Sequence, residues 1–599
     1  MFYYICLRRR SRSGTRGEAL TSRRAVESGQ RAVLPVSVEV EQYAKEVLDF
    51  SSHYGSENSM SYTMWNLAGV PNVYPSSGDF TQTAVFRAYG TWWEQCASAP
   101  PPFRRTPKGF HSQDYIELGF EEPVYPTAVE VLETYYPGAI VQILACSYNP
   151  FSQNPPTDVR WEVLWSGEPT KMLTPQARQF SPTIKHINFP TNLLRLEVNS
   201  SLLDYYTELD AVILRGVKER PMLALYKMPV IDISDLSDSE EELSDVGGPF
   251  RDSKHQRTGN GYFDKLPYEL IQLILSHLTL PDLSRLAQSC KLLHQHCCDP
   301  LQYTQLSLQP YWGRLSDASL GHLQSRCTLL QRLNLSWTGN RGALTLTGFS
   351  SFMKACGLSL VCLELSCCHF LNEACMEVVS QTCPGLQELN LSSCDRLNSQ
   401  AFTHISKLTR LRRLVLYRTK IEMHILKIHL LDVNCCLCLL QIEDYDVVAS
   451  MLAARCRSLC SLDLWRCRNL TDRGLAELVS GCRMLEELDL GWCPTLQSST
   501  GCFQHLARSL PRLRKLFLTA NRTVCDSDIE ELAASCLSLQ HLDILGTRLV
   551  SAASLKKLLQ SCPQLLLLDV SFCSQIDMRV VQELSGSFPN VAIKKSFTQ

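Results

Sequence analysis

The stretch GYFDKLPYELIQLILSHLTLPDLSRLAQSCKLLHQHCCDPLQY, from Gly261 to Tyr303, decides how the chain is organised. After Leu266-Pro267, apolar residues recur three or four positions apart, a spacing typical of an amphipathic helix. Pro267 suits the first turn of that helix, and Pro281 ends it and begins a second one. Short helices spanning about forty residues cannot bury a core alone, so we expect their apolar faces to dock on another surface. The alternative is an ordinary helical hairpin inside a larger domain.

The same stretch resembles an F-box. It matches that family's pattern at Leu266, Pro267, Glu269, Leu270, Ile274, His277, Leu278, Asp282, Leu283, Ala287, Cys290 and Lys291. The resemblance implies binding to the S-phase-kinase-associated adaptor of a cullin–RING ubiquitin ligase. It assigns that contact to Leu266, Pro267, Glu269, Leu270, Ile274, Leu278 and Leu283. Proteins of this kind catalyse no reaction; they hold a substrate beside a ubiquitin-charged enzyme.

Downstream of these helices, the pattern L-x2-L-x-L repeats to the end of the chain. It begins at Leu330, Leu360, Leu386, Leu411, Leu459, Leu485, Leu513, Leu539 and Leu565, with small substitutions in places. Several units continue with a cysteine at the ninth position and then a helical stretch. This pattern is typical of cysteine-containing leucine-rich repeats, which stack strand–turn–helix units into an α/β solenoid. The order of segments resembles the F-box/leucine-rich-repeat family over nearly the whole chain.

The repeat strands predict a binding surface. The leucines at positions four and six face the core, so positions three, five and seven should face the concave side. Position five is often acidic, and aromatic residues stand close to it, which favours a groove for a basic segment of a substrate. The candidate residues are Tyr417, Asp463, Trp465, Asp489, Trp492, Phe517, Asp543 and Asp569. Small acids and amides are also common at position five in such repeats, so a family habit is the alternative.

One interval between repeats, from Leu411 to Leu459, is about twice as long as the others. We interpret it as two units, one of them damaged near residues 420–441, as a splice variant or an error in the gene model would produce. A unit without its strand should uncouple the repeats on either side of it. Cys435 and Cys438 lie there in C-x-x-C spacing, but no second pair follows, so we predict no metal site.

The N-terminal third predicts an antiparallel β-sandwich. Short β-prone runs such as Tyr115–Phe120, Ala128–Thr134 and Ile140–Cys146 lie between turn signals. Alternation of polar and apolar residues in the runs YIEL, from Tyr115, and RLEV, from Arg195, predicts half-buried strands. The runs NLAGVPNVYPSSGD and ELDAVILRG resemble a discoidin-like or galactose-binding sandwich. Such domains bind sugars, lipids or proteins. No loop residue matches a binding motif, so a scaffold or protein-contact domain is the alternative.

Two further segments carry targeting or interaction signals. Residues 1–34 are rich in arginine and poor in acids, a composition typical of transit peptides, although a disordered basic tail is the alternative. Met1 to Leu7 followed by Arg8 to Arg10 suits an interfacial membrane anchor. Residues 227–260 predict an acidic, flexible linker. Within it, Val230, Ile231 and Ile233 resemble a SUMO-interaction motif, a short pattern that also matches by chance.

Because an F-box must meet an adaptor of the cytosol and nucleus, we expect attachment to the mitochondrial outer membrane with the body facing the cytosol. The cytoplasm and nucleus are further locations. Substrates would then include outer-membrane proteins.

Composition limits the remaining functions. The chain has 599 residues, a formal net charge of −2 and no basic stripe with interleaved aromatics, so we expect no nucleic-acid partner. Many of its 27 cysteines recur at fixed repeat positions, which favours buried thiols in a reducing compartment. No run of eighteen apolar residues predicts a membrane span. Motifs for phosphate binding, zinc hydrolysis and serine nucleophiles are absent from the sequence, so we predict no catalytic residues and no cofactor.

The sequence therefore predicts a multidomain protein. Its parts are a targeting segment (1–34), a β-sandwich (35–226), a linker (227–260), an F-box (261–305) and a repeat solenoid (306–599). The predicted function is substrate recognition for an SCF-type ligase, with the adaptor, the cullin, the RING subunit and protein substrates as partners. The alternative is a non-catalytic scaffold whose sandwich binds glycans or lipids.

Overall fold

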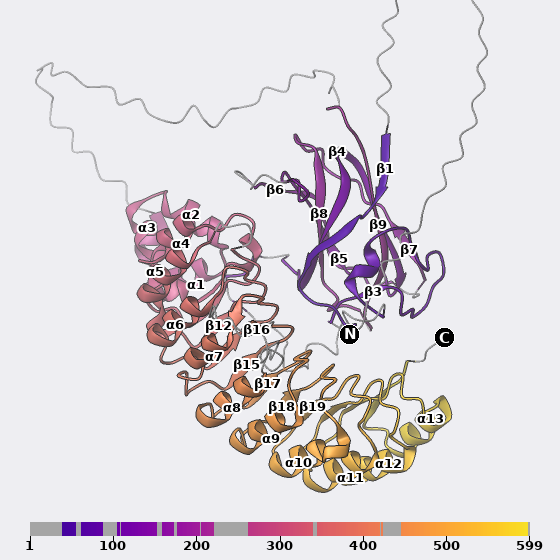
Figure 1. Ribbon diagram of the computed structural model, residues 1–599. Coiled ribbons are helices and arrows are strands. Elements are labelled where there is room, and N and C mark those ends of the chain that lie inside the picture. Colours follow the sequence, from indigo (N-terminus) through magenta and orange to yellow (C-terminus); the bar gives the residue numbers. More distant parts are fainter. Residues whose placement is uncertain are drawn as a thin grey trace, which may run out of the picture. The chain divides into compact units, whose positions relative to one another are not determined.

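The computed structural model describes residues 39–55, 61–87, 103, 105–107, 110–152, 159–172, 176–203, 205–220, 261–339, 344–419, 421–422 and 445–596. The predicted targeting segment, the linker with Val230, Ile231 and Ile233, and the pair Cys435 and Cys438 lie outside these residues. We call the described residues from 39 to 220 the β domain. The F-box helices and the repeat domain follow it (Figure 1).

The β domain is an antiparallel sheet, as predicted. Its nine strands are β1 (Glu39–Tyr43), β2 (Glu46–Phe50), β3 (Ala84–Val85), β4 (Asp114–Tyr135), β5 (Ile140–Cys146), β6 (Trp161–Ser166), β7 (Arg178–Phe180), β8 (Thr191–Val198) and β9 (Glu208–Val217). The main strand order is β1-β9-β4-β8-β5-β6. The runs Tyr115–Phe120 and Ala128–Thr134, which the sequence suggests as separate strands, belong to one strand, β4, which has 22 residues. The first half of β4 pairs with β8 and its second half pairs with β9. The register shifts near Pro123 and Pro126, where a proline has no N–H to donate to the neighbouring strand.

The central strands of the β domain are buried on both faces. Ile116 of β4 and Leu196 of β8 lie in the apolar core, as the alternation predicts. The intervening polar residues Glu117, Arg195 and Glu197 are buried as well, so the prediction of half-buried strands is wrong here. The reason is that the start of the repeat domain covers this face, where Trp312 contacts Arg195 and Glu197.

The F-box segment forms the predicted short helices. They are η4 (Gly261–Lys265), α1 (Tyr268–Ser276), α2 (Leu280–Ala287), α3 (Lys291–Cys297) and η5 (Pro300–Tyr303). Pro267 stands at the N-cap of α1. Thr279 caps α2 by accepting a hydrogen bond from the Asp282 backbone, and Pro281 occupies the first turn of α2. A small core of Ile271, Leu275, Leu283, Ala287 and Cys297 holds the helices together.

The repeat domain is a parallel sheet with a helix after most strands, which confirms the predicted repeat architecture. Its ladder of eleven strands is β10 (Gln305–Ser307), β11 (Arg332–Asn334), β12 (Cys362–Glu364), β13 (Glu388–Asn390), β15 (Arg413–Val415), β17 (Ser461–Asp463), β18 (Glu487–Asp489), β19 (Lys515–Phe517), β20 (His541–Asp543), β21 (Leu567–Asp569) and β22 (Ala592–Lys594). The helices follow one another along one side of this sheet (Figure 1). They are α4 (Asp317–Leu323), α5 (Leu346–Cys356), α6 (Glu373–Thr382), α7 (Ser399–Ile405), α8 (Tyr445–Arg455), α9 (Asp472–Gly481), α10 (Cys502–Ser509), α11 (Asp526–Ser535), α12 (Ala552–Ser561) and α13 (Met578–Ser587).

The long interval does not interrupt the sheet. Its described residues include one ladder strand, β15, and one helix, α8, and β15 pairs directly with β17 through Val415 and Asp463. A short side ladder joins β14 (Leu397–Asn398) to β16 (Ile421–Glu422). The strands on either side of the interval therefore form one continuous sheet. The damaged segment predicted near residues 420–441 lies outside the described residues except for Ile421 and Glu422, and the loss of stability expected from it stays a prediction.

The described cysteines of the repeats are free thiols, and all except the half-buried Cys460 and Cys525 are buried. At the ninth position, Cys394, Cys493 and Cys573 each donate a hydrogen bond to a backbone carbonyl of the preceding repeat. These thiols tie neighbouring units together as small, nearly apolar side chains. Among the described helices, none combines the length and the apolar character that crossing a membrane requires.

Candidate functional site

Helix α1 of the F-box presents an apolar surface. The exposed fractions are 46% for Leu270, 57% for Leu273 and 46% for Ile274. Ile271 and Leu275, on the opposite face of the same helix, are buried. Exposed leucines and isoleucines clustered on one helix mark a surface for protein contact. Leu273 was not among the predicted adaptor residues, because the family pattern leaves its position open.

The other predicted adaptor residues lie in different environments. Glu269 is exposed on α1. Leu266 and Leu278 are half-buried against the F-box core, and Leu283 is fully buried inside it. Leu283 therefore holds α2 against the neighbouring helices and offers no surface to a partner in this structure.

An arginine of the β domain caps this helix. Arg105 is buried, and its Nη1 donates hydrogen bonds to the carbonyl oxygens of Leu275 (2.7 Å) and Leu278 (2.8 Å). Its Nε donates to the carbonyl oxygen of Gln302. A cation at a helix C-terminus satisfies carbonyl groups that lack partners within the helix. The β domain thus fixes the position of the F-box helix that carries the exposed patch.

The repeat strands bring the predicted groove residues together. The parallel register places Asp463 beside Asp489, Asp489 beside Phe517, and Asp543 beside Asp569. Position five therefore forms one continuous row on the face opposite the core. Carboxylates in adjacent strands repel one another unless a cation lies between them.

Arg87 of the β domain is the cation that meets this row. Its Nη1 lies 2.7 Å from Asp463 Oδ2, and its Nη2 lies 2.5 Å from Asp489 Oδ2. Its guanidinium carbon lies 4.5 Å from the ring centroids of both Tyr417 and Trp465. Burial raises the pKa of Asp489, and the charge of Asp463 adds to that shift while Arg87 opposes it. The site is a guanidinium held between two carboxylates and two aromatic rings.

The predicted open groove is therefore closed in this structure. Tyr417, Asp463, Trp465 and Asp489 are buried beneath the chain's own β domain. Of the remaining candidates, Phe517, Asp543 and Asp569 are also buried, and Asp569 pairs with Lys594 at 3.2 Å. Burial, together with the charge of Asp569, raises the pKa of Asp543 to about 7. Trp492 alone among the predicted residues is only half-buried, at the edge of this row.

A second arginine, Arg195 of β8, joins the β domain to the first repeats. Its guanidinium carbon lies 3.5 Å from the ring centroid of Tyr115 and 3.7 Å from that of Trp312. It pairs with Glu117 at 3.2 Å and with Glu197 at 3.1 Å, and the Trp312 indole donates a hydrogen bond to Glu197. Sequence alternation alone gave no sign of this contact, because the ion pairs form within the sheet face that the repeats cover.

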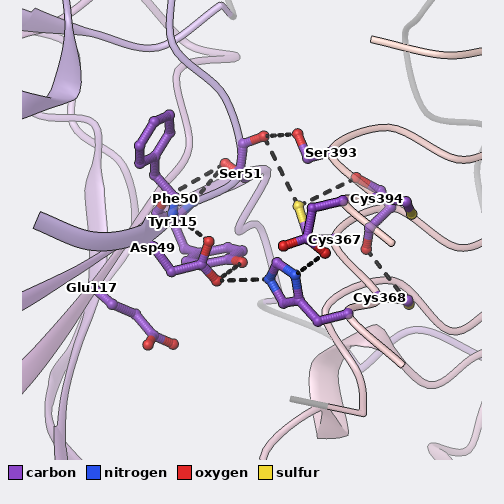
Figure 2. A network of polar contacts seen from close by, with 12 residues as sticks. Asp49, Phe50, Ser51, Tyr115, Glu117, Cys367, Cys368, Ser393 and Cys394 are labelled. Atoms are coloured by element: carbon purple, nitrogen blue, oxygen red, sulfur yellow. Dashed lines mark hydrogen bonds and ion pairs between the residues drawn. The ribbon is translucent and has the colours of Figure 1, made fainter. Parts of the chain in front are cut away.

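The segment from Asp49 to Gly55 runs along the turns of successive repeats. The Ser51 carbonyl accepts hydrogen bonds from Cys367 and Ser393, which stand at the same position of two neighbouring units (Figure 2). Arg418 and Arg466, at this position in the next two units, donate to the carbonyls of Phe50 and Gly55, respectively. Four consecutive repeats thus hold the segment through side chains at the same turn position.

His369 adds an ionic link at the start of this segment. Its Nε2 lies 3.2 Å from Asp49 and its Nδ1 lies 3.1 Å from Asp395. Burial alone would lower its pKa, but the hydrogen bonds and charges of the two carboxylates raise the pKa of His369 to about 10. An imidazolium donating to both carboxylates is therefore the form that links β2 to the repeats near neutral pH.

One group of possible metal ligands exists within the described residues. The donor atoms of Cys362, Glu364 and Glu388 lie within 4.8 Å of one another. Burial raises the pKa of the Cys362 thiol and of the Glu364 carboxyl, and Arg332 pairs with Glu388 at 3.1 Å. A protonated thiol, a carboxyl with a raised pKa and a carboxylate already paired with a guanidinium suit an ion-pair network better than a cation site.

The model of F-box-like domains matches residues 263–309. The F-box/LRR-repeat protein 4 of Bos taurus is 68% identical over 614 residues, which cover 100% of this chain and 98% of the relative. The chain belongs to the F-box/leucine-rich-repeat family.

Two solved structures share a limited likeness with it. The crystal structure of the Rad7 and Elc1 complex in yeast has a TM-score of 0.32 at 17% identity, covering 55% of this chain and 88% of that one. An internalin from Listeria monocytogenes has a TM-score of 0.29 at 17% identity, covering 46% of this chain and 70% of that one.

Replacing Arg87 tests the closure of the repeat face. Arg87→Ala should destabilise the protein by about 3–5 kcal/mol, because it leaves two buried carboxylates without their cation. Urea unfolding measures this loss, and limited proteolysis reports release of the β domain. The stability of Arg87→Lys should lie between those of the native protein and Arg87→Ala, because an ammonium keeps the charge but cannot bind both carboxylates as a planar guanidinium does. Unchanged stability of Arg87→Ala would contradict the closed arrangement.

The His369 link predicts a dependence on alkaline pH. Its folded pKa is raised from 6.5 to about 10, so its contribution is complete below pH 6.5 and is lost as pH rises through about 10. The free energy of unfolding should fall over that interval in the native protein and fall less in His369→Gln. His541→Gln is the matched control, because burial lowers the pKa of His541 to about 4 and it stays neutral throughout. Equal slopes for the native protein and His369→Gln would refute the ionic link.

Proposed function

We propose that the chain is the non-catalytic substrate-recognition subunit of an SCF-type cullin–RING ubiquitin ligase. The single observation that carries this proposal is the exposed apolar patch of Leu270, Leu273 and Ile274 on the F-box helix. Membership of the F-box/leucine-rich-repeat family supports it. The adaptor would cover this patch, and the repeats or the β domain would hold the substrate.

Such a receptor acts by proximity. It raises the effective concentration of the substrate near the ubiquitin-charged enzyme, and the benefit depends on a restricted geometry. The capping of α1 by Arg105, and the burial of Arg87 and Arg195 against the repeats, restrict the geometry here. The β domain would therefore serve as a brace between adaptor surface and substrate surface. We also propose that it is a discoidin-like sandwich used for protein contact, since it makes extensive contacts within the chain.

Charged substitutions in the apolar patch test the adaptor surface. The double variant Leu270→Asp, Ile274→Asp should lose recovery of the adaptor and cullin, because a carboxylate in a buried apolar contact is strongly disfavoured. Both residues are exposed, so the fold should persist, as circular dichroism can verify. The matched control is Leu537→Asp, Leu566→Asp, two exposed leucines of the repeats at 55% and 54%. A folded patch variant that still recovers the adaptor at the native level would remove the basis of the proposal.

The location of the protein belongs to the same proposal. The arginine-rich segment 1–34 favours mitochondria, whereas the adaptor is expected in the cytosol and nucleus. Attachment to the outer membrane with the body facing the cytosol satisfies both conditions. Proteins of that membrane, or precursors retained there, would be the substrates.

Deleting residues 1–31 should release the protein into the cytosol without loss of adaptor binding. The short apolar start and the arginines that follow would provide interfacial and electrostatic attraction to an anionic membrane surface. Fractionation of cells that express the full chain or the truncated chain measures the change. Protease added to intact mitochondria should digest the body of the full chain; complete protection would place it inside and exclude this arrangement.

A further inference from the structure

A groove with a volume of about 570 Å³ lies between the F-box and the first repeat. One wall is the start of α2, and the other is α4 with the turn that follows it (Figure 1). The lining residues with apolar side chains are Leu280, Pro281, Leu308, Tyr311, Leu315 and Leu323. Three of them, Leu280, Tyr311 and Leu323, are half-buried and pack against the core of the repeats. The groove therefore exposes part of that core.

The position of α4 explains why this surface is uncovered. Its side chains Ser319, His322 and Leu323 line the groove at a spacing of three or four residues, so they share one side of the helix. On another side, Gln324 donates a hydrogen bond to Ser351 of α5. Each unit of a solenoid packs between two neighbours, and no repeat helix precedes α4 in the described chain. The F-box takes the place of that neighbour and covers the surface in part.

The rim of the groove is basic. Arg314, His322 and Arg326 line it, and none of the described residues that line it carries a carboxylate. Arg314 and His322 are exposed, and neither forms an ion pair within the described chain. The carboxylate of Asp282, on α2, pairs instead with Arg285 at 2.9 Å. An occupant that has apolar side chains and several carboxylates would match both the floor and the rim.

The linker of the same chain has this composition. We call residues 230–245 the acidic segment. It contains no lysine or arginine, and its apolar residues at the start are Val230, Ile231, Ile233 and Leu236. Its seven carboxylates are those of Asp232, Asp235, Asp238, Glu240, Glu241, Glu242 and Asp245. These residues lie outside the described chain.

The length of the linker allows the acidic segment to reach the groove. The 15 residues between Asp245 and Gly261 can span up to about 50 Å. Between Gly261 and the groove wall at Leu280 stand η4 and α1, and α1, with 9 residues, is about 14 Å long. A short flexible tether gives an effective concentration in the millimolar range. It therefore favours the acidic segment over a separate acidic peptide of equal affinity.

We infer that the acidic segment docks in the groove between α2 and α4. Its apolar side chains would cover the floor, and its carboxylates would lie beside Arg314, His322 and Arg326. Burial of the apolar side chains would provide most of the affinity, because ion pairs at an exposed rim contribute little. The docked segment would fasten the linker to the junction of the F-box and the repeats. It would also occupy the residues that resemble a SUMO-interaction motif.

Photo-cross-linking in the full-length protein tests the docking. The photoreactive residue p-benzoylphenylalanine replaces Ser234, which keeps every apolar residue of the acidic segment. Mass spectrometry after irradiation should find the adducts concentrated on residues 308–326. In a mixture of unlabelled and heavy-isotope-labelled protein, the adducts should join residues of the same chain. Adducts spread over the whole protein would overturn the docking, and adducts between chains would overturn the choice of occupant.

Cleavage by a protease specific for glutamate measures the undocked fraction, because Glu240, Glu241 and Glu242 lie in the acidic segment. When opening is fast, the cleavage rate follows the population of the open form. The variant Ile231→Ser, Ile233→Ser should be cleaved at least about tenfold faster, because it loses the apolar burial. The fold of this variant should match that of the native protein in thermal unfolding.

A charge reversal on the rim gives the complementary test. Arg314→Glu should raise the cleavage rate several-fold. Arg326 is less suitable, because it also donates a hydrogen bond of 3.5 Å to the Tyr303 hydroxyl. The matched control is Arg548→Glu, an exposed arginine of a distant repeat, which should leave the rate unchanged. Arg314→Gln takes the place of Arg314→Glu if the latter does not fold.

Two results of the proteolysis would overturn the inference. One is an equal cleavage rate in the native protein and in the variant Ile231→Ser, Ile233→Ser. The other is an equal change of rate in Arg314→Glu and Arg548→Glu, which would show a general effect of charge instead of a contact in the groove. Neither measurement depends on the adaptor, so the inference can fail while the proposed receptor function stands.

Discussion

The neutralisation of buried guanidinium groups is the constraint on which the arrangement of the described chain depends. Three arginines of the β domain, Arg87, Arg105 and Arg195, are almost completely buried. A buried charge is tolerated only when opposite charges, hydrogen-bond acceptors or aromatic faces replace water. Each of these arginines finds such partners partly or wholly outside the β domain. The two carboxylates beside Arg87 belong to the repeats, the carbonyls beside Arg105 to the F-box segment, and the ring of Trp312 beside Arg195 to the start of the repeat domain.

This constraint links the three regions more firmly than their order in the sequence suggests. Removing one partner from such a cluster leaves an uncompensated charge, so the contacts form and separate together. The Asp49–Gly55 segment strengthens the same association, because consecutive repeats bind it through side chains at one equivalent position. For a receptor that works by proximity, a braced connection between the F-box helix and the repeats restricts the positions that a bound substrate can reach. In the proposed receptor the β domain would therefore contribute by fixing the geometry, without any catalytic residue of its own.

The sequence predicted the elements that periodicity controls. Helix boundaries in the F-box follow from Pro267 and Pro281, and the strand ladder follows from the leucine spacing, including the alignment of Asp463 with Asp489. It also predicted that the acidic, aromatic row would bind a basic group. It did not predict which basic group, because Arg87 is remote in sequence and stands outside any motif. The burial of Glu117 and Arg195 was missed for the same reason, since alternation reports one covered face and cannot show that a second domain covers the other.

Effective concentration favours Arg87 over a separate substrate as the group that binds the acidic row. A side chain of the same polypeptide is present near its partner at an effective concentration in the millimolar range or above, whereas a separate substrate must compete from solution. Arg87 also brings the surrounding β domain with it, so a competing basic peptide would have to replace the Arg195 and His369 contacts as well. Surfaces at the centre of the concave face are therefore poor places for a substrate unless the β domain separates.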